Sequence, residues 1–411
     1  MKIGAKSRTQ IAIISSALIL LTSIILALSI GPVNISFTSI IKSFVGINNL
    51  TGQEHTVLFD LRLPRIILGI IVGAALATSG AVYQTVFRNP LADPYLLGAA
   101  AGAGLGATIA LTNSNSDISN LLPLFAFIGA LLAVLISFIF AGRFLNEPST
   151  LLLAGIAISS FATAVQTYLQ QRHSTSLRPV YSWILGELTT ANWRTVIWSG
   201  FYVSISLTIL FVIRKKLDAL LLSDDEAFSL GINSTQLRFI ALGAATLATA
   251  TAVAASGLIG FVGIVIPHLV KGLTHRVSNV NLPLIAIFGA AFLVLADLGA
   301  RTFLSPAELP IGVLTAFIGA PFFFFILVVN IFNAIVVTTL LIKSFEIIYD
   351  VFAIINFKAC IVNQADCDIT NLMSVNNVIK VEETSNFWIS CCLRFFIAQT
   401  NIVKSCTDLV K

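Results

Sequence analysis

Asp297 is the clearest candidate for chemistry in this sequence, because it is an ionisable residue inside an apolar stretch. The stretch reads Leu293-Val-Leu-Ala-Asp297-Leu-Gly-Ala-Arg301. A charge in such a place is costly and usually functional, so a proton or cation site is one hypothesis. Arg301 lies four residues later on the same helix face, and an intrahelical ion pair near the outer surface is the other. We favour the ion pair.

Other reactive residue types do not form a recognisable site. The sequence has no G-x-x-x-x-G-K-[ST] phosphate loop, so ATP binding of that kind would need another subunit. His268 and His275 lie two helical turns apart without further ligands, and Asp224-Asp225-Glu226 is a single acidic cluster. All five cysteines lie within 360–411. We therefore expect no catalytic site, no metal site and no cofactor.

Two arginines open the second apolar stretch, in Asp60-Leu-Arg62-Leu-Pro64-Arg65. Pro64 is suited to the first turn of a helix. Fixed guanidinium groups at an exposed face bind carboxylates with both nitrogens. The spacing alone leaves two interpretations open, capture of carboxylates and anchoring to lipid headgroups.

The longest polar stretch between apolar runs is 215–238, and it predicts a short helix. Ser223 can cap that helix, with acidic residues in its first turn, and Gly231 can end it in a left-handed conformation. This helix either closes a loop or fits a cytoplasmic partner.

The composition indicates a membrane protein. Of 411 residues, 57% are hydrophobic and 10% are charged, with a mean hydropathy of +0.94. Soluble domains carry about 25% charge, so a soluble enzyme, a disordered chain and a nucleic-acid binder are excluded. A span needs about 20 apolar residues. The sequence predicts an all-α, polytopic fold with ten spans, at about 11–30, 66–87, 95–111, 121–141, 149–169, 195–213, 239–256, 257–270, 282–300 and 309–329.

The distribution of positive charge predicts a cytoplasmic N-terminus. Lys2, Lys6 and Arg8 precede the first span, which is too long for a cleaved secretory signal. With this orientation eleven Lys and Arg face the cytoplasm and seven face outward, as the positive-inside rule requires. The net charge of +5 is thus a topology signal.

Glycines recur at four-residue spacing in two of the predicted spans. Gly69 and Gly73 share one helix face, and Gly98, Gly102 and Gly106 share another. Such faces let helix backbones approach closely in lipid. Helix packing is the simpler interpretation; the alternative is a sliding contact or the lining of a passage for a bulky solute.

Several motifs, taken in order, are similar to those of one family. They are Leu61-Arg-Leu-Pro-Arg65, Arg88-Asn-Pro-Leu-Ala-Asp-Pro-Tyr-Leu-Leu-Gly98, Leu151-Leu-Leu-Ala-Gly155, Asp225-Glu-Ala-Phe-Ser-Leu-Gly231, Ser256-Gly-Leu-Ile-Gly-Phe-Val-Gly263 and Ala307-Glu-Leu-Pro-Ile-Gly312. Over 1–329 the chain resembles the FecCD-type, BtuC-like permeases of ATP-binding-cassette (ABC) importers for iron-siderophores, haem and cobalamin.

The resemblance implies a type II importer permease that does no covalent chemistry. Its partners would be a second copy in a homodimer, two cytosolic ABC ATPase subunits that bind the ATP, and a periplasmic or lipoprotein substrate-binding protein. The substrate would be an iron chelate, with haem or cobalamin as variants. A secondary transporter that uses Asp297 and an ion gradient is the alternative.

The resemblance also implies roles for particular residues. The binding protein would dock on Arg62, Arg65 and Arg301. The ATPase would act on a coupling segment of Asp225, Glu226, Ala227, Ser229, Leu230 and Gly231. The translocation path would narrow at Asn89 and Leu91, and at Pro148 and Ser149, where the match to the family is loose.

The remainder, 330–411, departs from the family. The 34 residues from Leu309 to Ile342 carry no charge, and about 51 Å of helix is more than one membrane crossing. We expect a break near Asn330 and Asn333. The rest is a cytoplasmic appendage, an interfacial segment or the product of read-through or a frameshift, which we favour because no motif emerges.

Overall fold

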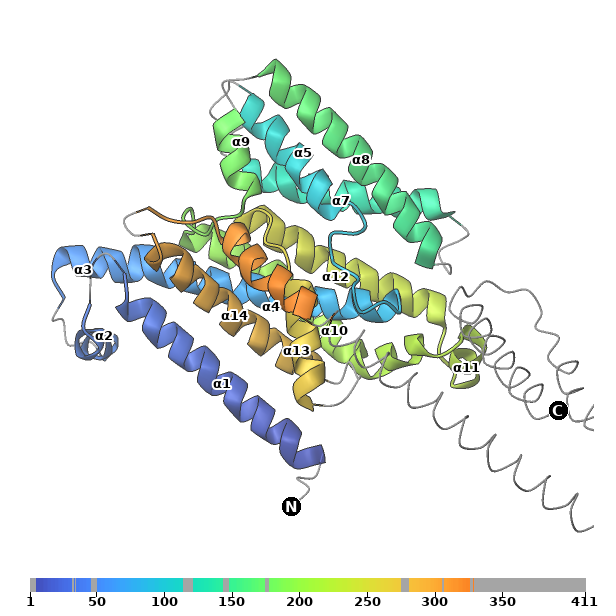
Figure 1. Cartoon of the computed structure of the whole chain (residues 1–411), viewed down its shortest axis with the longest axis horizontal. Helices are drawn as coiled ribbons and strands as arrows, with labels where there is room; N and C mark the ends of the chain where they lie inside the picture. Colours follow the sequence, from blue (N-terminus) through green and yellow to red (C-terminus); the bar gives the residue numbers. More distant parts are fainter. Residues whose placement is uncertain are drawn as a thin grey trace, which may run out of the picture. The chain divides into compact units, whose positions relative to one another are not determined.

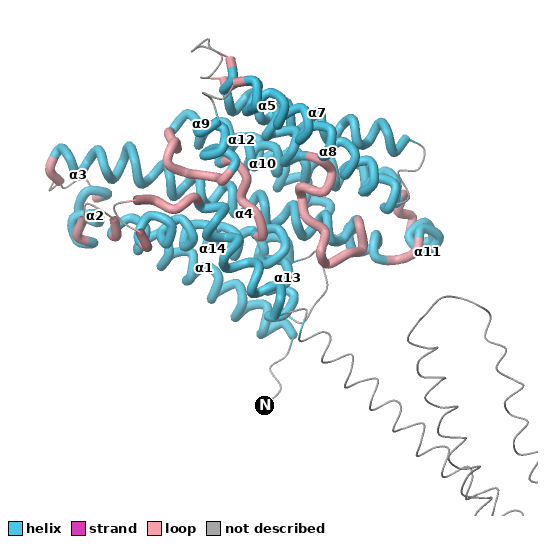
Figure 2. The backbone as a smooth tube through the Cα atoms, turned by 45° about the horizontal axis from the view of Figure 1, so that its top comes forward, coloured by secondary structure: helices cyan, strands magenta, loops and turns pink. Residues whose placement is uncertain are grey.

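Helices make up the regular structure in the part of the chain that the computed structural model describes (Figure 1). That part comprises residues 5–325, except 32, 34, 46–49, 114–120, 143–147, 174–176, 275–280 and 305–306, together with residue 328. It contains no strand, as Figure 2 shows. The expectations for 330–411, including the break near Asn330, lie outside the described residues.

Ten apolar helical segments account for the ten predicted spans. Seven are long enough to cross a membrane. They belong to α1 (Ala5–Ser29), α4 (Leu63–Val86), α7 (Leu122–Ala141), α8 (Pro148–Arg172), α10 (Trp193–Leu217), α12 (Ser234–Ser256) and α14 (Leu282–Thr302). Three are shorter, namely α5 (Ala99–Thr112), α13 (Val262–Thr274) and Ile311–Phe325.

Short helices lie between the spans. They are α2 (Phe37–Phe44), α3 (Gly52–Thr56), the π-helix η1 (Val57–Arg62), α9 (Leu177–Ile184), the 3₁₀-helix η4 (Asp218–Leu221) and α11 (Asp224–Ser229). α3 and η1 run directly into α4. Figures 1 and 2 both place α3 and α11 at opposite ends of the helices.

Two predicted spans start later than expected. The span predicted from 95 begins at Ala99, and the span predicted from 257 begins at Val262. In both cases a glycine with positive φ lies before the helix: Gly98 has φ +89° and Gly257 has φ +70°. Hydropathy does not register such a conformation, which interrupts a helix within an apolar run.

α4 is the central helix. α10, α12, α13 and α14 pack around it, and most of its membrane-spanning part is buried. α5 packs against α7 and α8, and α1 packs chiefly on α14. The core residues of α4 and α12 are mainly alanine, glycine and other small residues, which let the two backbones approach closely.

The glycine faces are packing contacts. A Cβ atom at Gly73 would overlap the backbone of Gly289, and one at Gly102 would overlap that of Gly129. Gly106 lies against the backbone of Phe125 in the same way. The packing interpretation is confirmed at these positions, whereas Gly69 has only ordinary contacts with side chains.

Gly80 and Gly243 provide a matched test of this packing. At Gly80 a Cβ atom would overlap the backbone of Gly263 on α13, while Gly243 in α12 has no neighbour within 4 Å of such an atom. Gly80→Ala should lower the free energy of unfolding by about 1–3 kcal/mol. Gly243→Ala should leave it unchanged or raise it by up to about 1 kcal/mol, because alanine is the better helix former. Unfolding of the purified full chain in detergent measures both; equal effects would contradict the packing argument.

Candidate functional site

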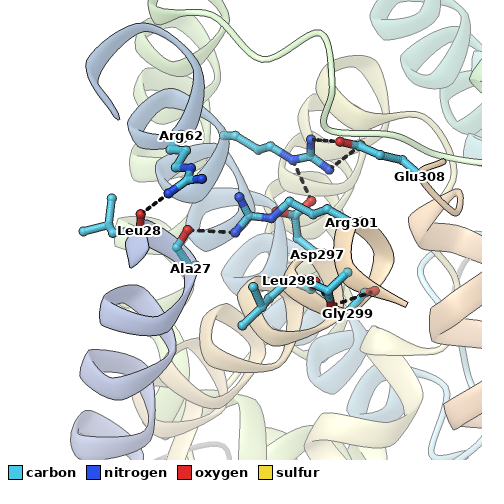
Figure 3. Close-up of polar contacts among 10 residues, drawn as sticks. Ala27, Leu28, Arg62, Asp297, Leu298, Gly299, Arg301 and Glu308 are labelled. Atoms are coloured by element: carbon cyan, nitrogen blue, oxygen red, sulfur yellow. Dashed lines mark hydrogen bonds and ion pairs between the residues drawn. The ribbon is translucent and has the colours of Figure 1, made fainter. Parts of the chain in front are cut away.

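Arg65, at the start of α4, joins three segments that are distant in sequence. Its Nε donates to Asp297 Oδ1 on α14 at 2.8 Å. Its Nη1 and Nη2 donate to the two carboxylate oxygens of Glu308 at 3.2 and 2.9 Å. Asp297 and Glu308, both labelled in Figure 3, therefore bind different nitrogens of the same guanidinium group. We call Arg62, Arg65, Arg301, Asp297 and Glu308 the outer cluster.

The predicted ion pair between Asp297 and Arg301 is confirmed. Arg301 Nε lies 3.5 Å from Asp297 Oδ2, and both side chains are buried. The closer partner of Asp297 is nevertheless Arg65, 232 positions away in sequence. Helical spacing could reveal the first partner but could not reveal the second.

The other two arginines of the cluster bind the C-terminal end of α1. Arg62 donates to the carbonyl oxygens of Leu28, Ser29 and Val33. Arg301 Nη2 donates to the carbonyl oxygen of Ala27 at 2.8 Å (Figure 3). The last carbonyls of a helix have no partner within the helix, so these contacts satisfy them.

The three predicted docking residues thus differ in accessibility. Arg62 is 4% exposed and Arg301 is 5% exposed. The Arg65 side chain is 12% exposed, and its partner Glu308 is 37% exposed. Of these three arginines, Arg65 is therefore the one that is paired with an exposed side chain. The sequence shows Glu308 only as part of the motif Ala307-Glu-Leu-Pro-Ile-Gly312, because its contact with Arg65 of α4 depends on the folded structure.

At the opposite end of the helices, α11 is a short, capped helix, as predicted. The Ser223 hydroxyl accepts from the backbone N–H of Glu226, and the Glu226 carboxylate accepts from the backbone N–H of Ser223. The bonds from the backbone and hydroxyl of Ser223 hold the pKa of Glu226 below its ordinary value. Gly231, with φ +72°, follows the end of the helix.

α11 is anchored on one side only. Asp224 Oδ1 lies 2.6 Å from Arg238 Nη2 of α12 and 3.8 Å from Arg88 Nη2, which follows α4. Ala227 is fully buried. The side chains of Asp225, Glu226 and Ser229 are exposed. Phe228 on α11 is 79% exposed, and Leu230, which follows the helix, is 64% exposed, so this polar segment also presents two large apolar side chains.

The cap of α11 leads to a local prediction. Ser223→Ala removes the side-chain bond to Glu226 and should cost about 1 kcal/mol. We expect about fivefold faster amide exchange across 224–229, measured by hydrogen–deuterium exchange mass spectrometry. Ser229→Ala is the control, because its hydroxyl only donates back to the carbonyl of Asp225 within the helix. Similar exchange in the two variants would contradict the capping role.

The residues predicted to narrow the path lie at two places in the chain. Asn89 and Leu91 form one turn after α4, in which Asn89 Oδ1 accepts from the backbone N–H of Leu91 at 2.9 Å. Leu91 is 49% exposed. Pro148 is the first residue of α8, and Ser149 follows it with an exposed side chain.

Arg88 connects this turn to the residues directly before α11. Its Nε donates to the carbonyl oxygen of Leu220 at 2.7 Å, and its Nη2 donates to that of Leu222. Arg88 adopts a left-handed conformation, with φ +49°, directly before Asn89. The part of the chain described here holds no group of three His, Cys, Asp or Glu side chains placed to bind a metal ion.

In the part of the chain that the structure describes, ten apolar helical segments, seven of them long enough to cross a membrane, indicate a polytopic membrane protein. Residues 19–329 match the family model of the FecCD transport family. The chain belongs to this family.

Two relatives and a solved structure illustrate the similarity. The Fe(3+)-citrate import system permease protein YfmE of Bacillus subtilis is 35% identical over 78% of this chain and 96% of its own length. The cobalamin import system permease protein BtuC of Halobacterium salinarum is 40% identical over 65% of this chain and 72% of its own length. A structure assigned to a metal-chelate type ABC transporter, inward-facing, matches with a TM-score of 0.68 and 31% identity over 76% of this chain and 96% of its own.

Proposed function

We propose that this chain is the permease subunit of an ATP-driven importer that carries an iron chelate across the cytoplasmic membrane. The chelate is a siderophore or citrate complex, with haem or cobalamin as close variants. Two copies form the path, two cytosolic ATPase subunits supply the energy, and a substrate-binding protein delivers the chelate outside. Membership of the FecCD family and the names of the relatives support this proposal.

The separation of the two polar sites is the observation that carries the proposal. Arg65 lies in the first turn of α4, and Arg88, two residues beyond the end of that helix, contacts Asp224 of α11. The 24 residues of α4 span about 36 Å, and the hydrocarbon core of a bilayer is about 30 Å thick. The outer cluster and α11 therefore fit opposite membrane surfaces. With the N-terminus inside, α11 faces the cytosol.

The contacts also support a route by which movement of the ATPase is transmitted to the translocation path. The ATPase docks on the exposed residues of α11, namely Asp225, Glu226, Phe228 and Ser229, and on Leu230, which follows the helix. Movement of α11 is passed through Asp224 to Arg88, and Asn89 follows directly in the chain. The turn that narrows the path thus moves with the docking helix, and Pro148 and Ser149 are the second place at which we propose that the path narrows. The chain itself performs no covalent step.

Reconstitution with the partners tests the proposal. The full chain is purified with the ATPase encoded beside it, and vanadate-sensitive ATP hydrolysis is measured with and without the substrate-binding protein. We expect a stable complex, stimulated hydrolysis and uptake of radioactive iron citrate into proteoliposomes. Competition by hemin or cobalamin identifies those variants. Uptake that persists without the ATPase and follows a proton gradient would contradict the proposal.

A further inference from the structure

We propose that Glu308 is an internal carboxylate that occupies Arg65 until an acidic side chain of the substrate-binding protein displaces it. The inference rests on the proposed function, because it assumes that Arg65 takes part in docking. It assigns to Glu308 a regulatory role at the same surface. Glu308 sets how strongly the outer face binds its partner.

The geometry at Arg65 leaves no second place for a carboxylate to bind end-on. Glu308 accepts from Nη1 and Nη2 with its two oxygens, and Asp297 accepts from Nε. A guanidinium group offers this planar edge to one carboxylate at a time. An incoming carboxylate that seeks the same two-point contact must therefore replace Glu308.

The two carboxylates differ in how easily they can be replaced. The Asp297 side chain is 3% exposed and is also paired with Arg301 within α14. The Glu308 side chain is 37% exposed, and Glu308 lies outside the helices, between α14 and Ile311–Phe325. Asp297 therefore holds Arg65 in place, whereas Glu308 can exchange with a group that arrives from solvent.

The charge of the outer cluster favours such an exchange. Three arginines and two carboxylates leave a net charge of +1, and withdrawal of Glu308 raises it to +2. Without Glu308, the charge of Arg65 would no longer be fully balanced. The other two arginines of the cluster, Arg62 and Arg301, are both buried. An acidic side chain of the partner restores the balance, whereas water alone does not.

Exchange requires only a movement of the side chain. The next residue, Leu309, donates its backbone N–H to the carbonyl oxygen of Ala300 at 2.9 Å. Ile311 donates likewise to Gly186 at 3.1 Å. The backbone near Glu308 is thus held in place, and the carboxylate can swing away from Arg65 without unfolding the segment.

Binding of the substrate-binding protein to Glu308→Gln tests the inference. The full chain and its ATPase are placed in nanodiscs, and the Kd for the purified substrate-binding protein of the same system is measured by biolayer interferometry. We expect about a fivefold lower Kd, since an uncharged amide competes less well for Arg65. Asp60→Asn is the charge-matched control, because Asp60 is an exposed carboxylate on the same outer surface, and it should leave Kd unchanged.

Arg65 variants separate failure of the inference from failure of the proposed function. Arg65→Ala should weaken binding, and adding Glu308→Gln to it should produce no recovery. If Arg65→Ala binds like the wild type, the docking role and the inference both fail. If Arg65→Ala weakens binding but Glu308→Gln does not tighten it, or tightens it as Asp60→Asn does, only the inference is overturned. Should Glu308→Gln not assemble, Glu308→Asp is used instead. Its shorter side chain holds the carboxylate farther from Arg65, so it must also lower Kd.

Discussion

Phe228→Asp is expected to abolish assembly with the ATPase and to lower transport at least about 30-fold. Phe228 is 79% exposed on α11, although it is a large aromatic residue, and α11 lies at the end of the helices where we propose that the ATPase docks. Buried aromatic anchors at interfaces commonly contribute about 2 kcal/mol or more, and an aspartate at such a position must also be desolvated. Co-purification with the ATPase and uptake into proteoliposomes measure the effect.

The fold should not change in this variant, because other residues anchor α11. Asp224 pairs with Arg238, and Ala227 is the residue that packs inward. The midpoint of thermal unfolding of the permease alone should therefore equal that of the wild type. Phe228→Leu, which keeps an apolar side chain, is the matched control and should retain most of the assembly. An assembled, active Phe228→Asp complex would show that the ATPase docks elsewhere.

Asp297→Asn should lower the free energy of unfolding by about 3–5 kcal/mol. The carboxylate is 3% exposed and lies beside two guanidinium groups, those of Arg65 and Arg301. Its neutralisation leaves buried positive charges with one fewer counter-charge, and this is more costly than loss of the whole ion pair. Chemical unfolding in mixed micelles, with Asp297→Glu as the charge-retaining control, measures the loss.

The same variant distinguishes the importer from a gradient-driven transporter. If Asp297 were a proton or cation site, Asp297→Asn would remain as stable as the wild type but would lose uptake driven by an ion gradient. Loss of the ATPase would then have no effect. We expect the reverse: the variant is unstable, its residual uptake falls with the amount of folded protein, and uptake stops without the ATPase.

The lengths of the apolar stretches were sufficient to predict the helical spans. Each of the ten predicted spans corresponds to an apolar helical segment, because a bilayer requires long uncharged stretches whatever their neighbours. The starts of the spans near 95 and 257 were wrong. Gly98 and Gly257 take positive φ there, and Gly257 lies against the backbone of Trp183, a contact that depends on the folded arrangement.

The candidate sites were predictable only where they are local. The Ser223 cap, the end of α11 near Gly231 and the Asp297–Arg301 pair each join residues within a few positions, so spacing revealed them. The contact between Arg65 and Glu308 joins residues 243 positions apart, and that between Arg88 and Leu220 joins residues 132 apart. No periodicity connects such residues, since helix packing alone brings them together.

The attachment of α1 has a consequence for biosynthesis. The carbonyl oxygen of Ala27 receives its donor from Arg301, 274 positions later, and that of Leu28 receives its donor from Arg62. While the chain is being made, α1 enters the membrane long before α14 exists. Its outer end therefore stays incomplete until the ribosome has passed residue 301. The first helix to be inserted is among the last to reach its final hydrogen bonding, so its docking onto α14 is a late step of assembly.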